Sequence, residues 1–299
     1  MSGTGPWSRR RWVVSVGAAW GAGLGPGGGC SSVRAQEARL LAEARSPYNH
    51  IVVAEQGTVR TMYFVVEGTY YIESRFDRSH PRSLDLDYTR TMMAGFLVNP
   101  RIRSLLMIGF GGGQISNYLF ERLPGLEVDG VDIDPEVIRL ARAYFGVPED
   151  DRYRTHAADG RTFVAQSARR WDMIILDAFR GVVVPPHLKT RQFYQTCLEH
   201  LNDDGVLVAN LHDNSGSYAD DRATFAAVFP TRYAFESEGG GQTSLVASAD
   251  DRWVGVYEMR GNVEGLRDVF DFDLLGLTAR YHPGRRWQGR GRVLGDEGP

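Results

Sequence analysis

The chain has 299 residues, of which 42% are hydrophobic and 24% charged, and its formal net charge is −3. This ordinary globular composition excludes a disordered, collagen-like or disulfide-scaffold protein, and the length suffices for one large α/β domain with a small appendage. A nucleic-acid partner is not expected, because domains that bind nucleic acids usually carry a strongly basic face. With only Cys30 and Cys197, a cysteine zinc site is not expected either.

Residues 1–35 differ in composition from the rest of the chain. Ser8 and three arginines precede an apolar stretch from Trp12 to about Leu24, and small residues follow as far as Ala35. These are the parts of an export signal, and the arginines resemble a twin-arginine signal. We therefore expect an exported, periplasmic protein cut after Ala35; the alternative is an unstructured leader on a cytoplasmic protein. No later apolar run approaches the roughly 20 residues that a bilayer requires, so no membrane span is expected.

Residues 46–87 predict a small N-terminal antiparallel β domain. Three β-rich runs, 50–53, 61–66 and 70–73, are separated by turn residues at Gly57 and Gly68. Short runs of this kind with turns between them are typical of hairpins.

The sequence pattern changes at Tyr88, and residues 88–280 are expected to form a second domain. A helix fits 88–98, and beyond it strands and helices alternate. The strands are expected at 104–108, 127–133, 153–157, 171–176 and 206–211, and the helices at 114–122, 135–145, 160–168 and 190–201. This alternation is typical of a doubly wound parallel sheet, whose ligands bind at the carboxyl ends of the strands. Residues 281–299, rich in Arg and Gly, are expected to be a solvated tail.

A glycine-rich turn follows the first expected strand of the second domain. Gly109, Gly111 and Gly113 let the backbone approach a ligand closely, and the helix behind them offers free amide groups. A dinucleotide fingerprint would need Gly or Ala at position 114, so Gln114 weighs against NAD. The spacing suits an adenosyl-methionine type of ligand instead; a tight packing turn is the alternative.

Carboxylates follow the next three expected strands. Asp132 can accept hydrogen bonds from both ribose hydroxyls, whereas Asp134 is expected mainly as a helix cap. Asp159 is either the acceptor for an adenine amino group or only an N-cap. Asp177 follows an apolar strand at the mouth of the crevice. Because the strands are parallel, these side chains are expected around one crevice.

Residues from about 46 to 247 resemble the spermidine synthase (polyamine aminopropyltransferase) family, especially its diverged bacterial members. The stretches that carry the resemblance are 46–51, 88–92, 108–113, 132–134, 158–160, 176–177, 186–194 and 204–207. The resemblance implies an α/β fold with a Rossmann-like, doubly wound sheet of the S-adenosylmethionine-dependent transferase type. It also implies a small N-terminal antiparallel β domain and an assembly that is often a homodimer.

The resemblance further implies a transferase that moves a propylamine group from decarboxylated S-adenosylmethionine to a polyamine or related amine. By position, Asp177 would be the catalytic base, with Tyr88 assisting it. Asp132 would hold the ribose and Asp159 the adenine. The residues expected to bind the donor are Asn49, Gly109, Gly111, Gly113, Asp132, Ile133, Asp159 and Gly160. No metal ion is expected to take part.

Three positions depart from the family pattern. Arg180 stands where the family has a second carboxylate, Gly112 stands where it has an aspartate that holds the donor's amine, and Asn49 replaces a glutamine. Each lost carboxylate removes attraction for a cationic substrate. Two other readings stay open: an S-adenosylmethionine-dependent methyltransferase, which Gly112 and Arg180 favour, and a non-catalytic adenosyl- or polyamine-binding protein, which export would favour.

Three further residues have less specific signals. His187, in the loop after Asp177, is either a substrate gate or a structural loop histidine. His156 is expected as a satisfied histidine on a strand. Cys197 lies on the apolar side of an expected helix, where packing is favoured over reactivity.

Overall fold

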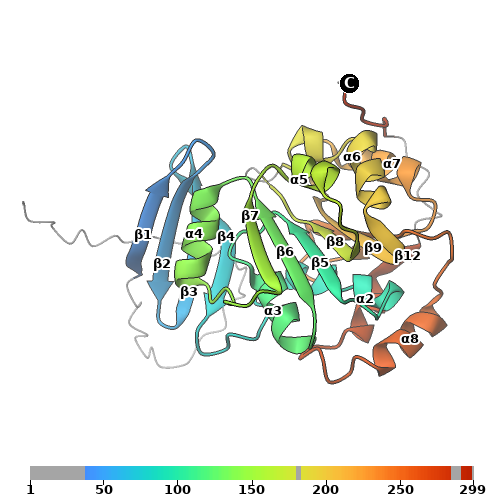
Figure 1. Cartoon of the computed structure of the whole chain (residues 1–299), viewed down its shortest axis with the longest axis horizontal. Helices are drawn as coiled ribbons and strands as arrows, with labels where there is room; N and C mark the ends of the chain where they lie inside the picture. Colours follow the sequence, from blue (N-terminus) through green and yellow to red (C-terminus); the bar gives the residue numbers. More distant parts are fainter. Residues whose placement is uncertain (1–37, 180–182, 284–290, 298–299) are drawn as a thin grey trace, which may run out of the picture.

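The computed structural model describes residues 38–179, 183–283 and 291–297. The expected export signal and Arg180 lie outside these residues. The described residues form two sheets, and Figure 1 shows the smaller one beside the larger one, with helix α4 between them.

The small sheet is antiparallel, as expected, with its strands in the order of the sequence. Gly57 and the pair Glu67-Gly68 have positive φ angles, which tight hairpin turns require. One face of the sheet buries Ile51 and Met62 against Leu140 of α4. The strands are β1 (Arg39–Arg45), β2 (His50–Gln56), β3 (Val59–Val66) and β4 (Thr69–Asp77). Strand β1 is an addition to the three runs that the sequence predicts.

The large sheet has eight strands in the order β12-β10-β11-β9-β8-β5-β6-β7. Strands β5 to β9 are parallel, and β10 to β12 extend the sheet in antiparallel pairs beside β9. The sheet is therefore mixed rather than wholly parallel. Its strands are β5 (Ser104–Ile108), β6 (Glu127–Asp132), β7 (Tyr153–Ala157), β8 (Trp171–Leu176), β9 (Leu201–His212), β10 (Arg232–Glu236), β11 (Gln242–Ser248) and β12 (Tyr281–Pro283).

Helices cover both faces of the large sheet, which makes it doubly wound as expected (Figure 1). One face carries α1 (Asp87–Met92), α2 (Gly95–Val98), α3 (Gln114–Arg122), α4 (Pro135–Tyr144) and α8 (Val256–Glu264). The other face carries α5 (Gly160–Gln166), α6 (Arg191–Glu199) and α7 (Tyr218–Val228). Two 3₁₀ turns, η1 (Pro186–Leu188) and η2 (Leu275–Arg280), lie in the connections. The chain order changes direction between β5 and β8, so a crevice is expected at that point.

The structure corrects three expected boundaries. The helix expected at 88–98 is broken into α1 and α2. Strand β9 begins at Leu201 rather than at 206. The sheet also continues past residue 280, because β12 pairs with β10. Near the C-terminus, Leu294 receives a hydrogen bond from the Arg191 amide and donates one to Thr224, so this part of the expected tail packs on α6 and α7.

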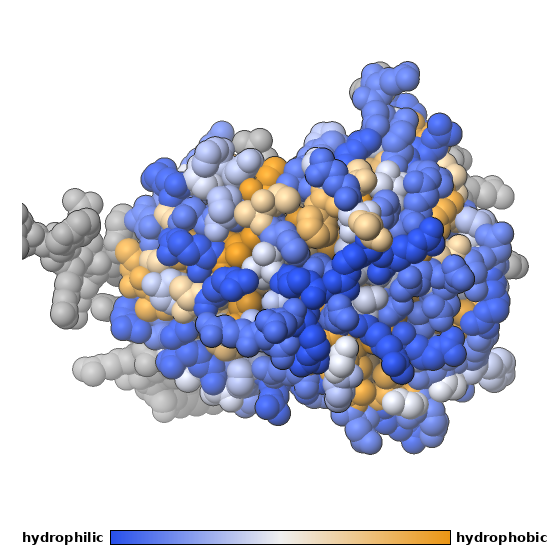
Figure 2. Space-filling view, in the orientation of Figure 1, coloured by the Kyte–Doolittle hydropathy of each residue, from blue (hydrophilic) through white to orange (hydrophobic). Residues whose placement is uncertain are grey.

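The helices of the described residues include none that is both long and apolar enough to cross a membrane. Figure 2 shows a mostly hydrophilic face, with apolar residues over the small sheet and between it and helices α5 and α6.

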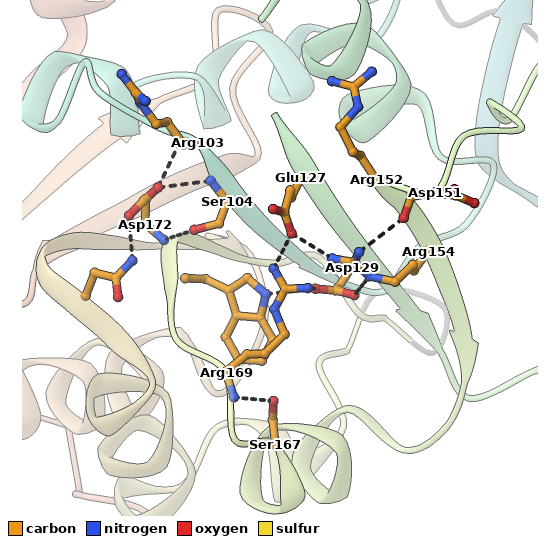
Figure 3. A network of polar contacts seen from close by, with 12 residues as sticks. Arg103, Ser104, Glu127, Asp129, Asp151, Arg152, Arg154, Ser167, Arg169 and Asp172 are labelled. Atoms are coloured by element: carbon orange, nitrogen blue, oxygen red, sulfur yellow. Dashed lines mark hydrogen bonds and ion pairs between the residues drawn. The ribbon is translucent and has the colours of Figure 1, made fainter. Parts of the chain in front are cut away.

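A polar network lies at the amino ends of the parallel strands, on the edge of the sheet opposite the crevice (Figure 3). Its centre is Asp129, which is 2% exposed and accepts hydrogen bonds from Arg154, His156 and Trp171. Burial opposes ionisation of Asp129, but these three donors hold its pKa well below the usual range. The contact confirms that His156 is a satisfied histidine. Glu127 joins the network at the surface, where it pairs with Arg154 and Arg169.

We predict that Asp129→Ala lowers the free energy of unfolding by about 2–3 kcal/mol, because the buried Trp171 indole and the half-buried Arg154 and His156 side chains lose their shared acceptor. Urea unfolding followed by circular dichroism would measure this loss. The matched control is Glu127→Gln, whose side chain is 45% exposed and should cost about 0–1 kcal/mol. Equal losses in the two variants would contradict the central role of Asp129.

Candidate active site

Two adjoining cavities lie where β5, β6 and β8 end. The first is bounded by α1, the glycine turn and the residues before α1; the second lies toward η1 and the start of α5. The first includes Ser74, Arg75, Asp85, Tyr88, Gly111 and Gln114. The second includes Asn49, Asp132, Ile133, Asp159, Gly160 and His187. Glu73, Gly109 and Asp177 line both cavities, so the two form one crevice with a shared wall.

The glycine turn after β5 has the left-handed backbone that its glycines allow. Gly109, Gly111 and Gly113 have φ angles of 85°, 52° and 74°. A Cβ atom at Gly109 would lie 2.4 Å from the backbone oxygen of Asp177. Only glycine permits this approach, and it brings the turn directly against the strand end that carries the expected base.

The surroundings of Gly112 explain why position 112 has no side chain, where the family that the sequence resembles has an aspartate. Its amide donates a hydrogen bond of 2.8 Å to the Ser74 hydroxyl on β4. A Cβ atom at Gly112 would lie 2.7 Å from the Ser74 Cβ atom and 3.0 Å from the Phe145 ring. Strand β4 therefore occupies the space that a side chain at position 112 would need.

The two aspartates at the end of β6 have different surroundings. Asp132 accepts hydrogen bonds from the amides of Gly111 (3.1 Å) and Asp134 (3.0 Å), and it lines the second cavity. Burial of its carboxyl group raises its pKa to about 6, although these amides act in the opposite direction. Asp132 thus combines a fixed position with access to a ligand.

Asp134 is the N-cap of α4, which confirms that interpretation. It is fully buried and accepts a hydrogen bond from the Glu136 amide. It also accepts hydrogen bonds from the Ser46 hydroxyl at 2.6 Å and from the Asn49 amide group at 3.0 Å. Asn49 therefore lines the second cavity but already binds Asp134 through its side-chain nitrogen.

Asp159 and His187 form a contact that the sequence does not reveal. Asp159 caps α5 through the Thr162 amide, and its other carboxylate oxygen lies 2.7 Å from His187 Nε2. The cap interpretation is confirmed, while the role toward adenine stays a prediction. His187 has a partner and closes one side of the second cavity.

Asp177 lies at the shared wall of the two cavities. It accepts a hydrogen bond of 2.9 Å from the Asn210 amide group and another from the Tyr88 hydroxyl. Burial raises its pKa to about 7, and the two hydrogen bonds limit the rise. Burial, followed by the charges of Asp177 and Glu73, raises the pKa of Tyr88 well above its usual value. Tyr88 is therefore a neutral donor that orients Asp177.

Two site residues were not identified from the sequence. Asn210 lies near the end of β9 and holds Asp177, and Glu73 lies on β4 at the junction of the cavities. The run 70–73 was interpreted only as a strand. The polar pair Glu73-Ser74 at the end of this β-rich run was the signal in the sequence that this part of the strand meets something polar.

Cys197 is fully buried in the core, and burial raises the pKa of its thiol well above the usual range, as expected for a packing residue. Among the described residues, no group of three or more His, Cys, Asp or Glu side chains is arranged to hold a metal ion.

Residues 87–224 match the spermine/spermidine synthase domain. A polyamine aminopropyltransferase of Vibrio vulnificus is 32% identical over 215 residues, which cover 70% of this chain and 72% of that protein. The chain belongs to the spermine/spermidine synthase family. The structure of a probable spermidine synthase from Corynebacterium glutamicum superimposes with a TM-score of 0.68 at 19% identity, covering 85% of this chain and 96% of that one. This likeness confirms the expected α/β fold.

A methyltransferase also resembles the chain. The human eEF1A lysine and N-terminal methyltransferase is 30% identical over 173 residues, which cover 51% of this chain but only 25% of that protein. The methyltransferase reading is thus less supported than membership in the family of aminopropyltransferases.

Proposed function

We propose that this protein is an aminopropyltransferase that moves a propylamine group from decarboxylated S-adenosylmethionine to a small-molecule amine, a polyamine or a related compound. Family membership supports the reaction class. The observation that carries the proposal is the carboxylate of Asp177, which Asn210 and Tyr88 orient at the junction of two cavities.

In this reaction an amine nitrogen attacks the propyl carbon next to the sulfonium. The C–N bond forms as the C–S bond breaks, and sulfur leaves with the electron pair as a neutral thioether. A proton must leave the nitrogen, and Asp177 accepts it directly or through a water molecule. A base with a pKa of about 7 suits this task near neutral pH.

The second cavity is the proposed adenosyl site. Asp132 has a free face for the ribose hydroxyls, while Ile133 and Gly160 supply apolar and backbone surface beside it. Asp159 lies on the same wall, where it can receive the adenine amino group. The glycine turn lines both cavities at Gly109, so the sulfonium end of such a ligand would lie over this turn.

A methyltransferase is the second candidate. The observation that favours it is the absence of a side chain at Gly112, because methyl transfer needs no acidic pocket for an amine. Incubation with S-adenosylmethionine or its decarboxylated form, followed by mass spectrometry of the products, distinguishes the two reactions.

We predict that Asp177→Asn lowers aminopropyl transfer to putrescine by about 10²- to 10⁴-fold, because the variant keeps the shape of the side chain but cannot accept the proton. Its affinity for methylthioadenosine should stay within about threefold. In the unaltered protein, kcat/KM should rise with pH and level off above about pH 7, since only ionised Asp177 is a base. Initial rates across pH and calorimetric titration would measure both effects.

The matched control is Asp203→Asn, which removes an exposed carboxylate from the opposite end of the sheet. It should leave rate and affinity unchanged. Full activity of Asp177→Asn would refute the assigned role, and absence of transfer in the unaltered protein would refute the aminopropyltransferase.

We propose that the mature protein is exported and lacks residues 1–35. The arginines at 9–11, the apolar stretch behind them and the small residues up to Ala35 support this proposal. N-terminal sequencing of the protein from its native host should find a terminus at Gln36. An intact terminus on cytosolic protein would support the cytoplasmic alternative.

We also propose a homodimer, from the family resemblance. Five large apolar residues exposed on the small sheet support it: Leu40, Val66, Tyr70, Tyr71 and Ile72. Light scattering on the purified full-length chain should give twice its mass of 33.3 kDa, and a monomer mass would contradict the proposal.

A further inference from the structure

Glu73 is placed at the junction of the two cavities by strand β4. The hydroxyl of the neighbouring Ser74 accepts a hydrogen bond from the Gly112 amide, and this bond holds β4 against the glycine turn. A Cβ atom on Gly111 would lie 3.0 Å from Glu73 Oε1, so the carboxylate lies directly over the turn. Glu73 lines both cavities, and within the described part of the chain it shares this position with Gly109 and Asp177.

The Glu73 carboxyl group has no cationic partner and no hydrogen-bond donor among the described residues. The charged groups that act on its pKa are Asp132 and Asp177, which are carboxylates like Glu73 itself. Burial, followed by repulsion from these two carboxylates, raises the pKa of Glu73 to about 8. The Glu73 residue is half-buried, and a carboxyl group that is partly withdrawn from water without a partner has an energetic cost that a bound cation would offset.

We propose that Glu73 binds the primary ammonium of the donor's propylamine chain and thereby selects decarboxylated S-adenosylmethionine over S-adenosylmethionine. This inference rests on the proposed function. A donor whose ribose lies at Asp132 and whose sulfonium lies over the glycine turn directs its chain toward the first cavity. Glu73 and Asp177 both line that cavity and the adenosyl cavity next to it.

The same arrangement disfavours S-adenosylmethionine. Its chain carries a carboxylate next to the ammonium. The ammonium of a bound donor favours the ionised forms of Glu73 and Asp177, and these two carboxylates would repel the added carboxylate. Glu73 also takes the electrostatic role of a carboxylate at position 112, where β4 leaves no room for a side chain. The loss of an acidic residue from the turn is thus balanced by an acidic residue on the adjacent strand.

Arg75 also lines the first cavity and could attract a substrate carboxylate. Asp85 lines the same cavity, so among the described lining residues the carboxyl groups of Glu73, Asp85 and Asp177 outnumber the one guanidinium by three to one. The charges in this cavity therefore favour a cationic chain, and the experiment below separates the two outcomes.

The test compares three ligands by calorimetric titration of the full chain. Methylthioadenosine has the adenosyl thioether without an ammonium, decarboxylated S-adenosylmethionine adds the propylamine chain, and S-adenosylmethionine adds a carboxylate. The variants are Glu73→Gln, which removes the charge, Glu73→Asp, which keeps it, and Asp132→Ala. Glu67→Gln makes the same chemical change at an exposed turn of the β3–β4 hairpin and is the matched control.

In Glu73→Gln we expect decarboxylated S-adenosylmethionine to bind at least tenfold more weakly, while methylthioadenosine stays within twofold of the unaltered protein. The preference over S-adenosylmethionine should fall by a similar factor. Glu73→Asp should retain most of that preference, and Glu67→Gln all of it. Asp132→Ala should instead weaken all three ligands together, because they share the ribose.

An unchanged preference in Glu73→Gln would overturn the inference. Equal weakening of all three ligands in that variant would overturn it as well, since Glu73 would then only position the turn. If Glu73→Gln does not fold, loss of the preference in a folded Glu73→Asp also counts against it. Failure of the unaltered protein to bind any adenosyl ligand would instead refute the proposed function.

Discussion

The site depends on one hydrogen bond, from the amide of Gly112 to the hydroxyl of Ser74. This bond joins the glycine turn of the large sheet to strand β4 of the small sheet. The approach is so close that a side chain at position 112 has no space. The same contact brings Glu73, one residue earlier on β4, over the turn. A hydrogen bond from a backbone amide of one sheet to a side-chain hydroxyl of the other thus determines which charges line the crevice.

The carboxylates of the crevice differ in how completely the protein satisfies them. Asp134 is buried and has three donors, from Ser46, Asn49 and the Glu136 amide, so it is a structural group. Asp132 and Asp177 are held by donors on one side and open to a cavity on the other. Only the second kind can bind or deprotonate a ligand. All three residues are aspartates, and what distinguishes Asp132 and Asp177 from Asp134 is that their carboxylate oxygens can still accept hydrogen bonds from a ligand.

Much of the fold could be predicted from the sequence, because the parallel strands have a strong local pattern. The expected strands at 104–108, 153–157 and 171–176 agree with β5, β7 and β8 at both ends. The extension of β9 to Leu201 and the strands β10 to β12 were not predicted. Their pairing partners are distant in sequence or lie at the edge of the sheet, and local periodicity does not report such partners.

The candidate site could be predicted where it follows strand ends, and less well elsewhere. Parallel strands bring Asp132, Asp159 and Asp177 to one edge, so their proximity follows from the order of the elements. Glu73 reaches the same place from another sheet. No spacing along the chain indicates that approach, because it depends on how β4 docks on the glycine turn.

The small sheet is therefore a part of the crevice and not only an appendage. A ligand that contacts Glu73 on β4 and Asp132 on β6 bridges the two sheets, and separation of the sheets would destroy its site. Binding free energy then adds to the docking energy of the small sheet through thermodynamic linkage. Local opening of the β3–β4 hairpin becomes rarer when the ligand is present, and its backbone amides exchange hydrogen more slowly. The stability of the contact between the two sheets and the affinity for the ligand are therefore linked, so a change in one changes the other.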